Sequence, residues 1–88
     1  MLKARLPEAD FPQYAKNLGL TERFDPVTHA DMDGIIHNLR FVSGQKWFDP
    51  PPADQTTYFK HQRGPHTHSY SEVLWHSNGF VYFIAFRV

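Results

Sequence analysis

The stretch Ser69–Val88, SYSEVLWHSNGFVYFIAFRV, predicts most of the fold, because two alternating segments flank Asn78-Gly79. An Asn-Gly pair in this setting is typical of a two-residue β-hairpin with a type I′ turn, in which both turn residues have positive φ. Such a loop pairs Ser77 with Phe80 and sets the register of both strands. We therefore expect an antiparallel hairpin in this stretch.

Alternation along the two strands divides the hairpin side chains between two faces of the sheet. One face is apolar and is expected to pack against two helices as the core; it comprises Val73, Trp75, Phe80, Tyr82, Ile84 and Phe86. The other, the mixed face, comprises Tyr70, Glu72, Leu74, His76, Val81, Phe83, Ala85 and Arg87. His66 and His68 join it if the strand begins early enough. Because two helices cover only one side of so small a sheet, we expect the mixed face to be open.

The remaining elements are predicted from periodicity and from turn residues. Apolar residues at helical spacing predict helices over 11–18 and 29–42, the first ending at Gly19. Alternation predicts a short edge strand over 2–6, and threonines and aromatics predict a strand over 55–62. The prolines at 50–52 make the stretch WFDPPPADQ, residues 47–55, a stiff connector. The order is β-α-α-β-β-β, an α+β fold in which two helices lie on one face of an antiparallel sheet that ends in the Asn-Gly hairpin.

Length and composition limit the possible classes of protein. Eighty-eight residues suit a single domain over 1–88, and 16% aromatic residues supply the area that a small core needs. There is no cysteine, which excludes disulfides and thiolate metal sites and suits a reducing compartment. No segment resembles a signal peptide, and the longest apolar run, Phe80–Phe86, is too short to span a bilayer. We therefore expect a cytoplasmic protein with no membrane partner.

Charge restricts any nucleic-acid function to a local patch. Nine basic and nine acidic side chains give a formal charge of zero. Strong nucleic-acid binders usually carry a basic excess, because neutralising phosphates supplies much of their affinity. Six histidines add positive charge only at mildly acid pH.

The mixed face contains the residue types that RNA cleavage requires. Attack of a 2′-hydroxyl needs a base for its proton, an acid for the leaving 5′-oxygen and a cation for the non-bridging oxygens. Glu72 or a neutral His76 is the candidate base. A protonated histidine, His68 or His66, is the candidate acid, and Arg87 is the candidate phosphate ligand. The other candidate contacts with RNA are Tyr70, Lys60, His61, Arg63 and Phe83.

The element order, the length and the hairpin YSEVLWHSNGFVYFIAFRV resemble the RelE/ParE-type toxins. Several members of that superfamily are messenger-RNA endonucleases, ribosome-dependent or free, which a partner antitoxin holds inactive. The resemblance covers most of the chain as topology. It implies a toxin-like endoribonuclease of RelE type, with RNA or the ribosome and an antitoxin as partners, whereas the residue roles above come from chemistry alone.

A second interpretation is a metal site. The pattern His66-x-His68-x3-Glu72-x6-Gly79 is similar to the core of the first cupin motif, in which two histidines and a glutamate bind a divalent metal. Two imidazoles and a carboxylate suit zinc, iron or nickel and leave positions open for water or substrate. On this interpretation His66, His68 and Glu72 are the ligands, whereas the ribonuclease interpretation needs no cofactor.

A third interpretation is a small inhibitor or adaptor, for example a phage anti-defence protein, that binds a protein partner through the same face. Tyr, Phe, Trp and Arg are favoured at the centres of protein interfaces. Motifs of nucleophilic hydrolases, phosphate loops and dinucleotide sites are absent from the sequence. Whether the chain is an enzyme therefore stays open between the three interpretations.

Overall fold

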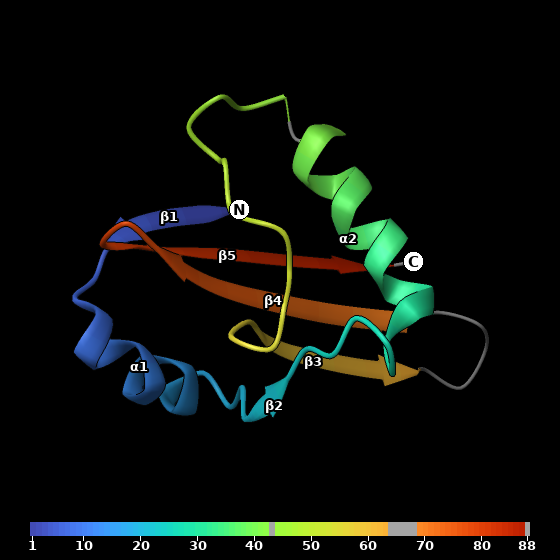
Figure 1. Cartoon of the computed structure of the whole chain (residues 1–88), viewed down its shortest axis with the longest axis horizontal. Coiled ribbons are helices and arrows are strands. Elements are labelled where there is room, and N and C mark those ends of the chain that lie inside the picture. The colour runs from blue at the N-terminus through green and yellow to red at the C-terminus, as the bar shows by residue number, and fades with distance from the viewer. Residues whose placement is uncertain (43, 64–68, 88) are drawn as a thin grey trace.

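A computed structural model of the chain describes residues 1–42, 44–63 and 69–87, which contain a five-stranded antiparallel sheet with strand order β1-β5-β4-β3-β2. The strands are β1 (Leu2–Arg5), β2 (Glu22–Arg23), β3 (Tyr58–Arg63), β4 (Ser69–Ser77) and β5 (Phe80–Arg87). The helices are α1 (Phe11–Asn17), which follows a 3₁₀ turn over Glu8–Asp10, and α2 (Ala30–Val42). The predicted α+β class is confirmed, and the predicted order holds with the short strand β2 added to it (Figure 1).

The β4–β5 hairpin has the predicted register. Ser77 pairs with Phe80, and the pairing continues along both strands to Tyr70 opposite Arg87. The turn residues at 78 and 79 have φ of 53° and 82°, the left-handed values that a type I′ turn requires. Asparagine and glycine are the residue types that adopt these values at least cost. The turn chemistry therefore sets which side chains share a face.

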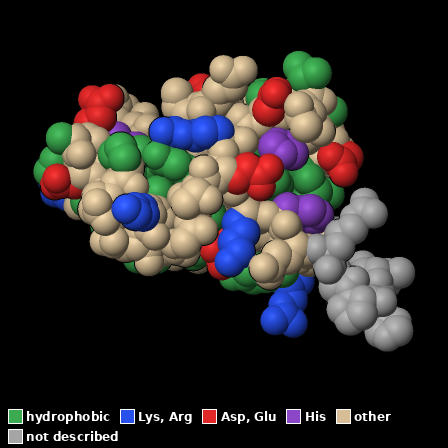
Figure 2. Space-filling model, turned by 90° about the horizontal axis from the view of Figure 1, so that it is seen from below, with side chains coloured by type: hydrophobic (Ala, Val, Ile, Leu, Met, Phe, Trp, Pro, Cys, Tyr) green, Lys and Arg blue, Asp and Glu red, His purple; other side chains and the backbone are tan. Residues whose placement is uncertain are grey.

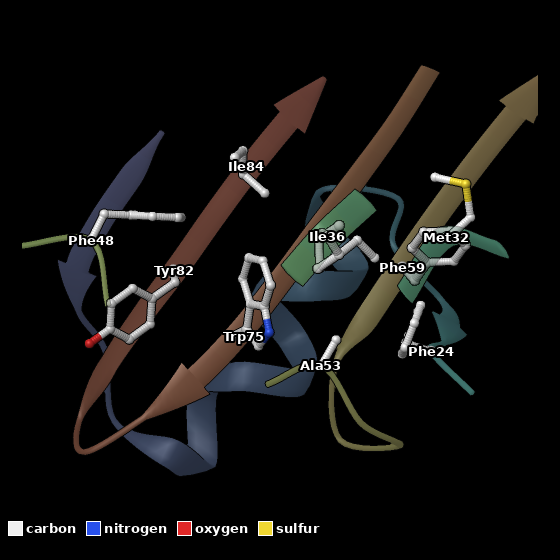
Figure 3. Packing of buried hydrophobic residues seen from close by; sticks show 10 residues of the cluster. Phe24, Met32, Ile36, Phe48, Ala53, Phe59, Trp75, Tyr82 and Ile84 are labelled. Atoms are coloured by element: carbon white, nitrogen blue, oxygen red, sulfur yellow. The ribbon is translucent and has the colours of Figure 1, made fainter. Parts of the chain in front are cut away.

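The core face is the one that the sequence predicts. Trp75, Tyr82 and Ile84 are buried there together with Val73. Phe48, from the segment before β3, packs edge to face on Trp75 and on Tyr82. Figure 3 shows most of these side chains in front of the strands, with the rest of the cluster: Phe24, Met32, Ile36, Ala53 and Phe59.

α1 covers the opposite face, so the prediction of two helices on one face is wrong. Phe11 and Ala15 of α1 belong to the same buried cluster as Leu74, which is 0% exposed. Val81 of β5 is buried in this cluster, and Phe83 packs against it. Figure 3 shows α1 behind the strands, on the far side from the labelled core. Leu74 and Val81 of the mixed face are therefore buried, and Phe83 is half-buried against the same cluster.

The short strand β2 explains why the helices lie on opposite faces. β1 and β2 form the two edges of the sheet, so the segment between them, which contains α1, crosses from one edge to the other. β2 pairs with Tyr58 and Phe59 of β3. From that edge the chain passes to the other face, where α2 lies (Figure 1). Two paired residues have no periodic pattern, so β2 could not be predicted from the sequence.

α1 ends where the sequence predicts, in a Schellman motif. The N–H of Leu20 donates to the Ala15 carbonyl at 2.9 Å, and the N–H of Gly19 donates to the Lys16 carbonyl at 3.0 Å. Gly19 has φ of 77°, a value that costs glycine nothing. Leu20 packs with Ala15 in the buried cluster, so the same turn that ends the helix directs the chain toward β2.

The proline-rich segment before β3 is attached to the sheet through Asp49. Lys3 Nζ lies 3.1 Å from Asp49 Oδ1, and the Tyr82 hydroxyl donates to the same oxygen at 3.1 Å. The hydrogen bond from Lys3 is the largest cause that lowers the pKa of Asp49, and the hydrogen bond from Tyr82 is the next.

In the described ranges neither α1 nor α2 is long and apolar enough to cross a membrane.

We expect the Asp49→Asn variant to lose part of the acid sensitivity of the fold. The folded-state pKa of Asp49 lies below its ordinary value of 3.8, so its contribution to stability is complete above that pH and is lost as the pH falls through the folded-state pKa. Urea unfolding from neutral to strongly acid pH measures this contribution. The difference in free energy of unfolding between wild type and variant should shrink toward the acid end, and a constant difference would contradict the role given to Asp49.

A second variant tests the position of α1. Leu74→Ala should lower the free energy of unfolding by about 2–5 kcal/mol, because it leaves a cavity between α1 and the sheet. The control Leu18→Ala, at a side chain that is 42% exposed, should change it by no more than about 0.5 kcal/mol. Equal, small effects of the two substitutions in urea unfolding would mean that α1 does not cover this face.

Candidate functional site

α1 leaves part of the mixed face uncovered, and this part is the candidate site. We call it the open half: Lys60 and Gln62 of β3, Tyr70 and Glu72 of β4, and Ala85 and Arg87 of β5. Each of these side chains is half-buried or exposed. Leu74, the next residue of β4 on this face, is fully buried, so the boundary of the cover lies between Glu72 and Leu74.

Tyr70, Glu72 and Arg87 interact within the open half. The Tyr70 hydroxyl donates a hydrogen bond of 2.6 Å to Glu72 Oε1, since residues two apart on a strand point to the same face. The Arg87 guanidinium lies over the Tyr70 ring, 5.9 Å from its centroid, since these residues are directly opposite in the register. A guanidinium, a phenol and a carboxylate thus lie in a row across two strands.

Glu72 raises the pKa of Tyr70. The hydrogen bond to the carboxylate is the largest cause, and desolvation adds to it, whereas the charge of Arg87 acts in the opposite direction. The phenol therefore keeps its proton at neutral pH and remains a hydrogen-bond donor.

Lys60 is a second basic residue beside Glu72 on this face of the sheet. It is directly opposite Glu72 in the β3–β4 register, and side chains of such a pair are neighbours, with Cβ atoms about 5 Å apart. Arg87 is diagonal to Glu72 on the other side. This arrangement can hold a phosphate at the two cations and accept a proton at the carboxylate between them.

His76 lies on the predicted face but away from Glu72. Its Nε2 is 2.6 Å from the Leu6 carbonyl oxygen, and its ring packs on Phe11 at the covered end of the sheet. Four residues along a strand span about 13 Å, so parity alone does not bring His76 and Glu72 into one site.

Two predicted RNA contacts also lie outside the open half. His61 is on the core face of β3, with Nδ1 2.8 Å from the hydroxyl of the buried Ser71 and its ring stacked beside Phe59. Phe83 packs against the α1 cluster. Of the predicted contacts, the structure brings together Lys60, Tyr70, Glu72 and Arg87.

The remaining predicted residues lie outside the part of the chain that is described. His66 and His68 are in the segment 64–68, and Arg63 ends β3 with its side chain outside the described set. Of the proposed metal ligands only Glu72 can therefore be placed. Within the described ranges, no group of three His, Cys, Asp or Glu side chains has the arrangement of a metal site.

Arg23 is a candidate ligand-binding residue that cannot be identified from the sequence. Its guanidinium lies 3.8 Å from the centroid of the Tyr58 ring and donates to the Tyr58 hydroxyl at 2.7 Å and to the Thr56 carbonyl at 3.0 Å. Only the pairing of β2 with β3 places Arg23 beside Tyr58, and β2 has no sequence signal.

Charges of both signs are mixed on the face that Figure 2 shows, which agrees with the formal charge of zero. Figure 2, a view from below Figure 1, shows Lys and Arg side chains interspersed with Asp, Glu and His side chains. Among the described residues on that face they form no extended basic area. With no net positive charge, a nucleic-acid contact depends on a few closely placed cations, such as those of the open half.

Comparison of the chain with protein-family models, with curated proteins and with solved structures finds no match. The resemblances to RelE/ParE-type toxins and to the cupin motif therefore stay predictions.

The two neighbours of Tyr70 should shift its pKa in opposite directions. Removing the carboxylate in Glu72→Gln should lower the pKa of Tyr70, and removing the guanidinium in Arg87→Gln should raise it further. An NMR pH titration of the tyrosine Cζ resonances measures both shifts, and the other three tyrosines are internal controls. Shifts of the same sign in both variants would contradict the described geometry.

Proposed function

We propose that this chain is a small endoribonuclease that binds single-stranded RNA on the open half of the sheet, in the cytoplasm. The observation that supports the proposal is the row of Arg87, Tyr70 and Glu72, with Lys60 opposite the carboxylate. It combines two phosphate-binding cations, an aromatic ring for a base and a carboxylate for a proton. These are the groups that RNA recognition and 2′-hydroxyl activation require.

Glu72 is the general base of the proposed reaction. Oε1 accepts the Tyr70 hydrogen bond, so Oε2 is the oxygen that takes the proton from the 2′-hydroxyl. The 2′-oxygen then forms a bond to phosphorus while the bond from phosphorus to the 5′-oxygen breaks. The products are a 2′,3′-cyclic phosphate and, once the 5′-oxygen has taken a proton, a 5′-hydroxyl.

Arg87 and Lys60 stabilise the charge on the non-bridging oxygens. Tyr70 is a positioning residue for Glu72, because its hydroxyl is bonded to the base at 2.6 Å and so lies on the same side of the phosphorus. Attacking and leaving oxygens are in line, so the acid for the 5′-oxygen must come from the opposite side. The predicted acid stays His68 or His66, both in the segment outside the described residues.

The position of α1 favours this proposal over the adaptor interpretation. That interpretation depends on apolar residues exposed among the polar ones, whereas Leu74 and Val81 are buried with α1 and Phe83 packs against their cluster. Apart from Ala85, the open half is polar and charged, which suits a phosphate backbone better than the centre of a protein interface. The resemblance to RelE/ParE-type toxins extends the proposal to ribosome-bound messenger RNA as substrate and to an antitoxin as protein partner.

RNA binding should depend weakly and measurably on salt. The slope of log association constant against log salt concentration should be about −1.4, because two phosphates of a single strand are contacted. Arg87→Ala removes one contact and should reduce the slope to about −0.7. Fluorescence anisotropy with a 2′-O-methyl oligonucleotide, which cannot be cleaved by this route, measures the slope. Lys16→Ala, at an exposed lysine of α1, is the matched control and should leave it unchanged. No binding at low salt, or equal slopes in all three proteins, would contradict the proposed contact.

Cleavage should depend on Glu72. Glu72→Gln keeps the size and the acceptor for Tyr70 but removes the base, and should slow cleavage of single-stranded RNA by about a hundredfold or more. The wild-type products should carry 2′,3′-cyclic phosphates, and EDTA should leave the rate unchanged.

Induced expression of the wild-type protein or of Lys16→Ala should arrest growth, whereas expression of Glu72→Gln should not. Absence of both cleavage and growth arrest in the wild type would contradict the proposal, and inhibition by EDTA would favour the metal interpretation.

A further inference from the structure

A separate cavity lies beside α1, at the covered end of the mixed face. Its volume is about 330 Å³, at the lower end of the range for small-molecule sites. It is lined by Glu8, Phe11, Pro12, Arg23, Thr56 and His76. These residues come from the 3₁₀ turn, the start of α1, β2, the segment before β3, and β4, so five parts of the chain meet there.

Arg23 is held in place before any ligand arrives. The Tyr58 ring supports the plane of the guanidinium at 3.8 Å, and two of its five N–H groups donate to Thr56 and Tyr58. The cation therefore loses little conformational freedom when it binds an anion with its other N–H groups. A planar guanidinium is suited to a carboxylate, which it can bind through two parallel hydrogen bonds.

His76 lines the same cavity and carries a second ring nitrogen that can accept a hydrogen bond. The Leu6 carbonyl can only accept, so the 2.6 Å contact requires the proton to be on Nε2. In the neutral ring Nδ1 is then unprotonated and can accept a hydrogen bond. The contact of the ring with Phe11, 5.2 Å between centroids, holds it in this orientation.

Glu8 supplies a negative charge to the cavity. It lies in the 3₁₀ turn and is exposed. Among the described residues, ion pairs join Lys3 to Asp49 and His29 to Glu22, and none joins Glu8 to Arg23. A carboxylate and a guanidinium that line the same cavity without pairing leave room for a ligand between them.

From this arrangement we infer that the cavity binds a small zwitterion, an α-amino acid with an apolar side chain. The ligand carboxylate binds Arg23, and the ligand ammonium donates to Glu8 and to Nδ1 of His76. The apolar side chain packs on Phe11 and Pro12. Each charge of the ligand meets the opposite charge, and its apolar part meets the apolar wall, so no group is left without a partner.

A series of related ligands tests the inference on the wild-type protein. L-Phenylalanine carries both charges, 3-phenylpropionate lacks the ammonium, and 2-phenylethylamine lacks the carboxylate. Titrations followed by NMR should show saturable shifts of the amide resonances of Arg23 and His76 with L-phenylalanine. Each of the two analogues should bind about tenfold more weakly or worse, because each loses a charge-assisted hydrogen bond.

Two variants assign each charge to its residue. Glu8→Gln should weaken the binding of L-phenylalanine about tenfold and leave the binding of 3-phenylpropionate unchanged. Arg23→Gln should weaken the binding of both ligands. Arg87→Ala, in the open half, is the control and should bind L-phenylalanine like the wild type, which separates this inference from the proposed ribonuclease function. Absence of saturable shifts at Arg23 and His76, or equal binding of all three ligands, would overturn the inference.

Discussion

The register of the β4–β5 hairpin is the constraint on which the rest of the structure depends. β1 pairs only with β5, and β3 pairs with β4. The register of the hairpin strands β4 and β5 therefore determines which side chains of β1 and β3 lie on each face of the sheet. A shift of one residue would exchange the faces and move Val73 and Trp75 out of the core. The turn also holds the chain that leaves β1, since the Gly79 carbonyl accepts the N–H of Leu6 at 2.9 Å. The Asn78-Gly79 turn therefore orders strands that are distant in the sequence.

A difference in length between α1 and β4 leaves the candidate surface uncovered. The seven residues of α1 extend about 10 Å, because a helix rises 1.5 Å per residue. The nine residues of β4 extend about 30 Å, because a strand rises about 3.3 Å per residue. α1 therefore covers one end of the mixed face and leaves the other end free. The open half lies beyond this cover, and the cavity lies at its margin.

Both candidate sites place an arginine on a tyrosine ring, and the difference between them suits different ligands. Arg23 lies 3.8 Å from the Tyr58 centroid and is also hydrogen-bonded, so its position is well defined. Arg87 lies farther from its ring, 5.9 Å from the Tyr70 centroid. A closely held guanidinium suits a small ligand of set geometry, whereas a more loosely held one can follow the phosphates of a flexible strand.

The amino-acid sequence by itself determines the hairpin, its register and the apolar core face, because these depend on local turn chemistry and on alternation. It also determines that Tyr70, Glu72 and Arg87 share a face, since parity within one hairpin is a local property. Tertiary structure alone decides which face each helix covers, because the crossing of α1 depends on the two-residue strand β2. It also separates His76 from Glu72 and brings Arg23 to Tyr58, since contacts between distant segments leave no periodic signal in the sequence.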